Sequence, residues 1–244
     1  RRYRAAGATT PDPKIAYQDW IINHEPKYQE LQEQKRQKFE YNPLISIVVP
    51  TYNTKKQFLQ ELVDSLEQQT YSNWELCIAD GNSENKVEIE DVIKRNRKIK
   101  YVLLDENKNI SGNTNEALKL CTGEYIGLLD HDDILAPFAL YEVVKALNED
   151  RRTDVIYSDE DKFTTLNGAR FQPHFKPDFS PDYLRSINYI THFFVLKKSL
   201  MDELGGFRDE YNGAQDYDII LRATEKAEKI VHIPKILYHW RVHE

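Results

Sequence analysis

An apolar run that ends in a cluster of acidic residues constrains this chain most. The run Tyr125 to Leu129 leads directly into Asp130-His131-Asp132-Asp133. A continuous apolar run is typical of a buried strand in an α/β sheet, and open sheets of this class bind ligands beyond the carboxyl ends of their strands. Carboxylates at positions i and i+2 of an extended turn repel each other unless a hard divalent cation lies between them and an anion. The cluster therefore predicts a cation site, and we expect the anion to be a diphosphate.

Helix capping is the simpler alternative for part of this cluster. Asp is a favoured N-cap and Pro a favoured first-turn residue, so Asp132 or Asp133 would cap a helix that begins near Pro137. Capping would account for one of the three acids and would leave the other two unexplained.

Alternating strand and helix patterns on both sides of the cluster predict the fold class. We expect strands at 45–49, 75–79, 100–104 and 125–129, with helices between them at 56–69, 84–96 and 112–120. This alternation predicts an α/β fold with a mainly parallel, Rossmann-like sheet, right-handed crossovers and helices on both faces.

The second half of the chain has a less regular pattern. We expect helices at 137–147, 198–204 and 216–227, and strands at 155–158, 191–196, 230–233 and 236–238. The acidic cluster Asp159-Glu160-Asp161-Lys162 is expected at a strand end that faces the same crevice. Residues 172–182 hold three prolines and are expected to form a loop that covers a site.

The N-terminal part differs in composition from the rest. Residues 1–13 show no periodicity and predict a tail, whereas 14–40 predict two helices that are separated at Pro26 and brace the main domain. We therefore divide the chain into a tail and helical extension over 1–43 and one domain over 44–244. The basic cluster Lys35-Arg36-Lys38 is interpreted as a solvated helix face, with peripheral contact to an anionic membrane as the alternative.

Charge and cysteine content limit the possible partners and compartment. The net charge of -7 argues against binding to nucleic acid. The two cysteines, Cys77 and Cys121, are too few for a disulfide framework, so we expect a reducing, cytoplasmic location, with a position at the inner face of the membrane as the alternative. No apolar run has the length of about 20 residues that a membrane-spanning helix needs. The chain begins with Arg1 and not Met, as a piece of a longer protein would.

The segment after the first strand lacks a phosphate-binding loop. Pro50-Thr51-Tyr52-Asn53 contains no glycine, which excludes a P-loop and a dinucleotide fingerprint there. Tyr52 and Asn53 are instead suited to present an aromatic face and an amide to a nucleobase. Asp80, after the second strand, is suited to accept the imide N–H of a pyrimidine. The equally favoured alternative makes Asp80-Gly81-Asn82-Ser83 an ordinary turn and helix cap.

Seven fragments, in their order along the chain, resemble the family 2 glycosyltransferases of the GT-A fold. Each fragment alone is weak, but the order is specific, and the fragments are residues 47–53, 79–81, 109–115, 123–133, 205–207, 215–218 and 238–243. Residues 157–162 and 176–179 are similar to the branch that builds bacterial surface polysaccharides. Ala79 and Thr114 depart from the family pattern, which commonly has an acid and an arginine there.

The resemblance implies a sugar transfer from a nucleoside diphosphate, UDP or dTDP, to a hydroxyl of a glycan or lipid-linked glycan, with inversion and with Mg²⁺ or Mn²⁺ as cofactor. It implies that the metal is held by Asp132 and His243, with His239 as the rival of His243 and packing histidines as the alternative. The residues implied to bind the nucleotide sugar are Pro50, Thr51, Tyr52, Asn53, Asp80, Asn113, Asp130 and His131.

Asp216 is the expected catalytic base. It follows the turn formed by residues 213–215, begins a predicted helix and matches the acidic position to which the family assigns this role. A positioned carboxylate can contribute about 10² to 10⁴ in rate as a general base. Its neighbour Asp218 is expected to pair with Arg222, four residues on. An N-cap is the alternative role for Asp216.

Three other classes compete with this assignment. The acidic turn also resembles that of the aspartate-nucleophile phosphatases, but here it follows the fourth strand, and Ile134 stands where Thr or Val is expected. A sugar-nucleotide nucleotidyltransferase would need a glycine-rich loop after the first strand. A non-catalytic sugar-binding or nucleotide-binding module would not need two acidic clusters together with Asp216.

Overall fold

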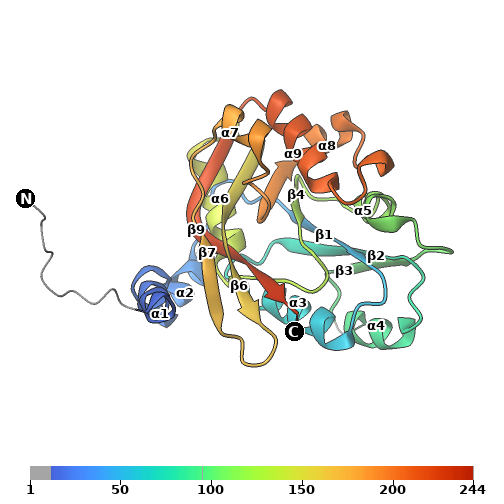
Figure 1. The fold of residues 1–244 in the computed structure, drawn as a ribbon, viewed down its shortest axis with the longest axis horizontal. Coiled ribbons are helices and arrows are strands. Elements are labelled where there is room, and N and C mark those ends of the chain that lie inside the picture. Colours follow the sequence, from blue (N-terminus) through green and yellow to red (C-terminus); the bar gives the residue numbers. More distant parts are fainter. Residues whose placement is uncertain (1–11, 95, 244) are drawn as a thin grey trace, which may run out of the picture.

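The computed structural model describes residues 12–94 and 96–243 (Figure 1). The predicted tail over 1–13 lies outside the described residues except for its last two positions. The first half of the described chain alternates as predicted. Its elements are β1 (Ile45–Thr51), α3 (Lys56–Glu67), β2 (Trp74–Asp80), α4 (Lys86–Ile93), β3 (Ile99–Leu103), α5 (Asn109–Leu118) and β4 (Tyr125–Leu128).

The second half adds further strands to the same sheet. Its elements are β5 (Ile134–Leu135), α6 (Ala139–Glu149), β6 (Val155–Thr164), β7 (Arg170–His174), α7 (Pro181–Ser186), β8 (Phe194–Lys197), α8 (Lys198–Leu204), η1 (Asp209–Tyr211), α9 (Gln215–Lys226) and β9 (Ile230–Val242). The strand order is β3-β2-β1-β4-β8-β6-β9-β5, and β7 pairs with β6. Strands β3, β2, β1 and β4 are parallel, β8 is antiparallel to both β4 and β6, and β9 is parallel to β6.

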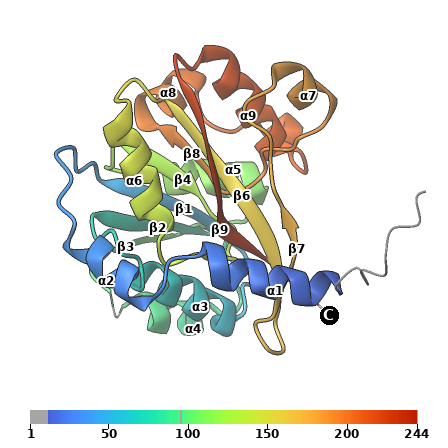
Figure 2. The same cartoon turned by 90° about the vertical axis from the view of Figure 1, so that its left-hand side faces the viewer.

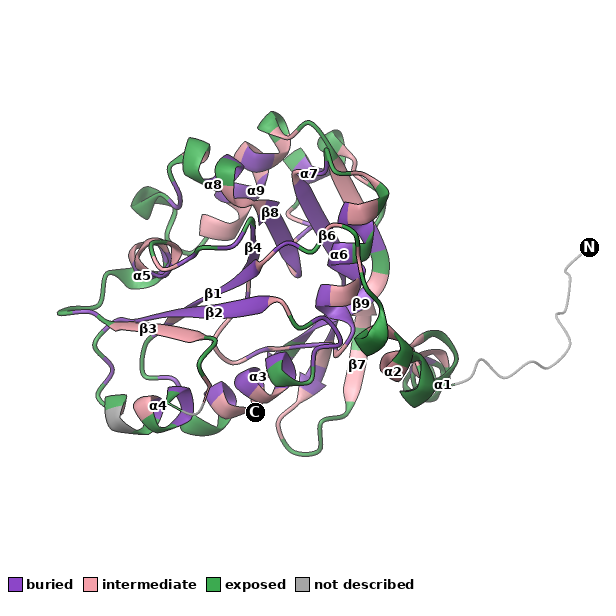
Figure 3. Ribbon diagram, turned by 180° about the vertical axis from the view of Figure 1, so that it is seen from behind, coloured by how far each residue is buried: buried purple, intermediate pink, exposed green. Residues whose placement is uncertain are grey.

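Helices cover both faces of this sheet, which confirms the predicted fold class (Figure 3). Side chains alternate along a strand, so β1 contributes Ile45, Ile47 and Val49 to one hydrophobic core and Val48 to the other. The first core also takes up apolar residues of α3, α4 and α6, and the second those of α5, α8 and α9. The almost completely buried β1 therefore holds its carboxyl end at a fixed place between the two layers.

Two predictions about strand ends are wrong. The acids of 159–162 lie inside β6 and not at its end, because each buried acid there has a partner and the strand can continue through them. The two short strands predicted at 230–233 and 236–238 are one strand, β9. Its register shifts where Ser158 faces Ile233 and Asp159 faces Ile236. This bulge accommodates Pro234, which has no N–H for the ladder.

The loop predicted over 172–182 is only partly a loop. Its first residues belong to β7 and its last two to α7. The side chain of Lys176, between them, is completely buried. Residues 175–180 therefore form a loop that Lys176 anchors in the interior, and its role as a cover over a site stays a prediction.

Two helices precede the sheet, as predicted, and they are separated around Pro26. They are α1 (Pro13–His24) and α2 (Tyr28–Arg36), and α1 lies beside β7 (Figure 2). The buried Tyr17 hydroxyl donates to Asp161 Oδ2 at 2.5 Å. Arg170 of β7 binds both Asp161 at 2.6 Å and Glu25 at 2.5 Å. These contacts join α1 to the sheet, whereas the division at residue 43 stays a prediction.

Both cysteines are free and buried. Over the described residues, the helices lack the combination of length and apolar character that a membrane span requires.

Replacing Tyr17 with Phe should lower the free energy of unfolding by about 1–2 kcal/mol, because the buried Asp161 carboxylate loses one hydrogen-bond donor. Urea denaturation measures this change. Tyr28→Phe on α2 is the matched control, since its ring is 75% exposed. Equal unfolding midpoints for the two variants would show that the Tyr17 hydroxyl does not hold α1 to the sheet.

Candidate functional site

A cavity of about 510 Å³ opens beyond the carboxyl ends of β1 and β4. Parallel strands present these ends at one edge of the sheet, which is where ligands of such sheets bind. The cavity is lined by Pro50, Thr51, Tyr52, Asn107, Asn109, Ile110, Asn113, Asp130, His131, Asp132 and Trp240. Seven of the eleven residues predicted for the site are among them.

A second, smaller cavity of about 50 Å³ adjoins the first. The two share Pro50, Ile110 and Asp130 in their linings. The smaller cavity also takes in Asp216 from the start of α9 and His192 from the segment before β8. The predicted base therefore lies next to the larger cavity, although about 86 residues of chain separate it from Asp130.

The acidic turn after β4 brings Asp132 and His243 together, as predicted. Asp132 Oδ2 lies 2.6 Å from His243 Nε2. Arg241 Nε donates to the backbone oxygen of Asp132 at 2.5 Å, so β9 holds the turn from its far side. His131 Nδ1 lies 3.9 Å from Asp132 Oδ1 and is buried without a hydrogen-bond partner.

Asp133 has a structural place in the same turn. Its fully buried carboxylate accepts hydrogen bonds from Tyr238 Oη at 2.6 Å and from the Arg241 N–H at 2.7 Å. Burial, and then the nearby charge of Asp130, raises the pKa of Asp133 well above its usual range. The capping alternative is wrong, because α6 has Phe138 at its N-cap position and no side-chain cap.

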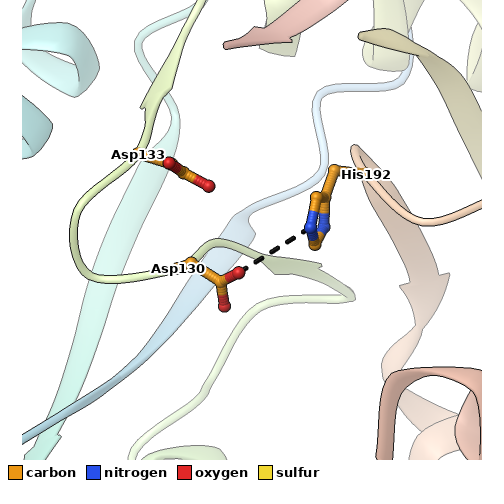
Figure 4. A group of neighbouring side chains, drawn as sticks. All are labelled: Asp130, Asp133 and His192. Atoms are coloured by element: carbon orange, nitrogen blue, oxygen red, sulfur yellow. Dashed lines mark ion pairs between the residues drawn. The ribbon is translucent and has the colours of Figure 1, made fainter. Parts of the chain in front are cut away.

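His192 joins this group and was missed by the sequence reasoning. Asp130, Asp133 and His192 offer ligand atoms that all lie within 4.8 Å of one another (Figure 4). His192 Nε2 lies 3.7 Å from Asp130 Oδ2, and its ring stacks on Tyr238. A single histidine before a short strand has no spacing that marks it as functional, so the sequence held no signal for it.

The residues predicted to bind the nucleobase make contacts within the protein. The buried Asp80 accepts hydrogen bonds from the Ser83 N–H at 2.8 Å and from Tyr101 Oη at 3.1 Å. Asn53 Oδ1 accepts from the Glu84 N–H at 2.9 Å. These are the contacts of the turn alternative, and neither residue lines the larger cavity. Their role toward a nucleotide stays a prediction.

The side chains of Asn113 and Tyr52 differ in how firmly the protein holds them. Asn113 Nδ2 donates to Asn107 Oδ1 at 2.9 Å, and Asn113 Oδ1 accepts from the Lys108 N–H at 3.0 Å. The amide of Asn113 is therefore already oriented on the cavity wall. Tyr52 is 46% exposed, which leaves its ring available to a ligand.

Asp216 has one side-chain partner among the described residues, Asn188, whose Nδ2 donates to Asp216 Oδ2 at 3.0 Å. The N-cap alternative is wrong, because the N-cap of α9 is Ala214. The predicted pairing of Asp218 with Arg222 is present at 2.7 Å, and Arg208 binds the same carboxylate. Asp218 is therefore engaged in ion pairs, and Asp216 is the acid that faces the cavity.

His239, the rival metal ligand, lies elsewhere. Its Nδ1 is 2.6 Å from Asp161 Oδ1. The ring lines a separate cavity of about 450 Å³, together with Arg170 and Arg241. The structure thus groups Asp132 with His243 and not with His239.

Glu160 and Lys176 form a buried ion pair beneath the small cavity, with 3.2 Å between Nζ and Oε2. Burial alone would raise the pKa of Glu160, but the His174 ring, whose Nδ1 lies 3.6 Å from Oε1, and the charge of Lys176 outweigh it and lower the pKa to about 2. Burial lowers the pKa of Lys176 to about 8, against the opposing charge of Glu160. The pair is therefore ionised at neutral pH.

Known proteins resemble this chain in sequence and in fold. Residues 46–207 match the family model "Glycosyl transferase family 2". The chain is 33% identical over 233 residues to the O-antigen biosynthesis protein RfbC of Myxococcus xanthus, which covers 94% of this chain and 18% of that protein. The chain spans about a fifth of the length of the curated relatives it matches first.

Two solved structures share the fold. The crystal structure of S. aureus TarS 1–349 in complex with UDP has a TM-score of 0.68 at 21% identity, over 81% of this chain and 60% of that one. The mannosyltransferase PcManGT from Pyrobaculum calidifontis, in complex with GDP-Man and Mn²⁺, has a TM-score of 0.61 at 17% identity, over 92% and 65%. Their likeness supports the GT-A architecture.

Glu160→Gln should lower the free energy of unfolding by about 3 kcal/mol at pH 7, because the pKa of Glu160 lies at about 2 in the folded chain and at 4.5 ordinarily. A depressed carboxyl pKa stabilises the fold above the ordinary value. This contribution is lost as the pH falls from about 4.5 to about 2. Urea unfolding at a series of pH values measures the difference.

The exposed Glu149 of α6 offers a matched control, since Glu149→Gln should cost less than about 0.5 kcal/mol at every pH. If the gap between wild type and Glu160→Gln were the same at pH 7 and pH 3, the ionised pair would not be the source of the stability.

Proposed function

We propose that this chain, which belongs to glycosyl transferase family 2, transfers a sugar from a nucleoside-diphosphate donor to a hydroxyl of a glycan or lipid-linked glycan. The donor is UDP-linked or dTDP-linked, and the product is a bacterial surface polysaccharide. One observation carries the proposal: a cavity large enough for a nucleotide sugar, with Asp132 on its wall, adjoins a smaller cavity that holds Asp216. Asp130 lines both cavities and therefore lies between the proposed nucleotide-sugar site and the proposed base.

The nucleotide is proposed to lie over the ends of β1, β2 and β4. Its base would contact Pro50, Thr51 and the exposed ring of Tyr52, next to Asn53 and Asp80. Asp130 would bind the ribose, and Asn113 and His131 would complete the wall. TarS, whose structures were determined with UDP and with UDP-GlcNAc, supports a uridine donor through its shared fold.

Asp132 and His243 are proposed to hold Mg²⁺ or Mn²⁺. Their ligand atoms lie 2.6 Å apart, close to the distance of about 3 Å between neighbouring ligands of an octahedral ion. His131 Nδ1, which has no hydrogen-bond partner among the described residues, lies 3.9 Å from Oδ1 of the same Asp132 carboxylate. The alternative group of Asp130, Asp133 and His192 fits less well, because Asp133 is already bound by Tyr238 and Arg241. An imidazole ligand favours Mn²⁺ over Mg²⁺, and the bound ion would neutralise charge on the departing diphosphate.

Asp216 is proposed to take the proton of the acceptor hydroxyl. As that oxygen attacks the anomeric carbon, the bond to the diphosphate oxygen breaks, and the proton moves to the Asp216 carboxylate. A single displacement of this kind inverts the anomeric configuration. Asp216 belongs to a rigid helix start, which favours base catalysis because the group is held in place before the reaction.

The partners and location follow from the same proposal. Nucleic acid has no role in it. A lipid-linked acceptor would bring the chain to the cytoplasmic face of the membrane, where the exposed Lys35, Arg36 and Lys38 after the middle of α2 offer positive charge.

Asp216→Asn should reduce turnover by about 10² to 10⁴, because the basic carboxylate is lost while shape is kept. Release of free nucleoside diphosphate from a panel of UDP- and dTDP-sugars with an acceptor glycan measures this. Asp209→Asn, an acid of the neighbouring η1, is the control and should retain turnover. Near-normal turnover of Asp216→Asn, or a product that retains the donor's anomeric configuration, would contradict the proposed mechanism.

Removal of divalent ions by EDTA should abolish the release, and Mn²⁺ should restore it at lower concentration than Mg²⁺. His243→Ala should weaken Mn²⁺ binding at least about tenfold, since even residues outside the ligand set of a metal are worth about 10- to 100-fold in affinity. The signal of unbound Mn²⁺ in electron paramagnetic resonance measures binding without an activity assay. His24→Ala on α1 is the control, and turnover that survives EDTA would rule the ion out.

A further inference from the structure

The segment of residues 188–192, between α7 and β8, forms a wall of the small cavity. Thr191 and His192 line it together with Asp130 and Asp216. Asn188, at the start of the segment, contacts Asp216 directly. The segment therefore touches both carboxylates, one on each side of the place where the proposed reaction occurs.

The amide of Asn188 has a defined orientation. Its Oδ1 accepts from the Thr191 N–H at 3.4 Å, and its Nδ2 donates to Asp216 Oδ2 at 3.0 Å. Because the amide oxygen is engaged by a backbone donor, the amino group is the end that faces Asp216. A carboxylate that accepts a hydrogen bond at one oxygen keeps the other oxygen aimed in a defined direction.

A buried ion pair holds the rest of the segment from beneath. Glu160 Oε2 accepts from Thr191 Oγ1 at 2.9 Å and from the His192 N–H at 3.0 Å. Lys176 Nζ donates to the Ile190 oxygen at 2.6 Å and to the His192 oxygen. Glu160 and Lys176 belong to the two motifs, 157–162 and 176–179, to which the proposed reaction assigns no role. Hydrogen bonds from these two residues hold residues 190–192 in place.

We propose that Asn188 is the positioning residue of Asp216: it donates the hydrogen bond that orients the carboxylate, on a segment that Glu160 and Lys176 hold in place. This inference rests on the proposed function of Asp216 as the base. A donor to the ionised carboxylate also favours the ionised form. Loss of the donor should therefore shift the acidic limb of the turnover profile to higher pH.

Two substitutions separate this role from a structural one. Asn188→Asp keeps the shape and the oxygen that accepts from Thr191 but replaces the donor with a second carboxylate. Asn188→Ala removes both. The titratable groups that line the cavity with Asp216 are Asp130 and His192, and Asp218, next along α9, is paired with Arg208 and Arg222. All of these stay unchanged, so a difference between profiles reports the contact at position 188.

We expect Asn188→Ala to reduce kcat about tenfold, a part of the contribution that a positioned base makes, with an unchanged KM for the nucleotide sugar. The acidic limb of its kcat profile should move to higher pH, and that of Asn188→Asp further, because a like charge beside a carboxylate disfavours ionisation. Asn148→Ala is the control. It removes an amide that binds the Tyr41 and Val144 oxygens, so it should lower the Tm without moving the limb.

The double variant Asn188→Ala with Asp216→Asn completes the test. A residue that acts through Asp216 should add no further loss to the residual turnover of Asp216→Asn. A further tenfold loss there, or an unmoved acidic limb in Asn188→Asp while Asp216→Asn is inactive, would overturn the positioning role alone. Full turnover of Asp216→Asn would instead overturn the proposed base, and the two failures are thereby distinguished.

Discussion

A buried carboxylate, Asp133, joins the acidic turn after β4 to the last strand of the sheet. Removing a carboxylate from water is costly unless hydrogen bonds replace the water, and here both donors, Tyr238 Oη and the Arg241 N–H, come from β9. The turn and β9 therefore form one unit. Trp240, between these two donors, lines the larger cavity. His243, one residue after the end of β9, lies 2.6 Å from Asp132 of the same turn.

The three acids of β6 do similar work along the neighbouring strand. Side chains alternate in a strand, so Asp159 and Asp161 point to one face and Glu160 to the other. Asp159 binds His232 of β9 at 2.9 Å, and Asp161 binds His239 of β9 and Tyr17 of α1. Glu160 binds the segment before β8. A single strand thus connects the N-terminal helix, the last strand and the wall of the small cavity by charge.

The sequence allowed the first half of the fold to be predicted closely, because its signals are local. Each of the strands β1 to β4 is short and mostly apolar, and such a pattern is recognisable without knowledge of its neighbours. The errors in the second half include β6 and β9, whose polar residues are satisfied only by partners far along the chain, and also the short elements β7, α7 and β8. Asp161, for example, interrupts any apolar pattern, yet Tyr17 and Arg170 make its burial possible.

The residues of the site also differ in whether a local sequence pattern predicts their place. Strand-end residues such as Asp130 and Asp132 could be placed from the sequence, because the ends of parallel strands meet at one edge. The pairing of His243 with Asp132 came from family resemblance, since no local pattern relates residues about 110 positions apart. The functional places of His192 and Asn188 escaped prediction. His192 fell within the strand predicted at 191–196 and Asn188 outside every predicted element, and neither position carries a functional signal in the sequence. Glu160 and Lys176 hold the segment of these two residues through hydrogen bonds to the backbone of residues 190 and 192. Backbone hydrogen bonds of this kind cannot be recognised from the pattern of side chains.

Charge explains why such a wall must be rigid. The larger cavity gathers the carboxylates of Asp130 and Asp132, and Asp216 lies just beyond it. Carboxylates this close repel one another, and each is free to rotate unless a donor holds it. His243 faces Asp132, His192 faces Asp130, and Asn188 faces Asp216. Two of these three partners come from the segment that the buried Glu160–Lys176 pair supports. The separation between Asp130 and Asp216, the acids proposed to meet the donor and the acceptor, therefore depends on a pair of charges that touches neither.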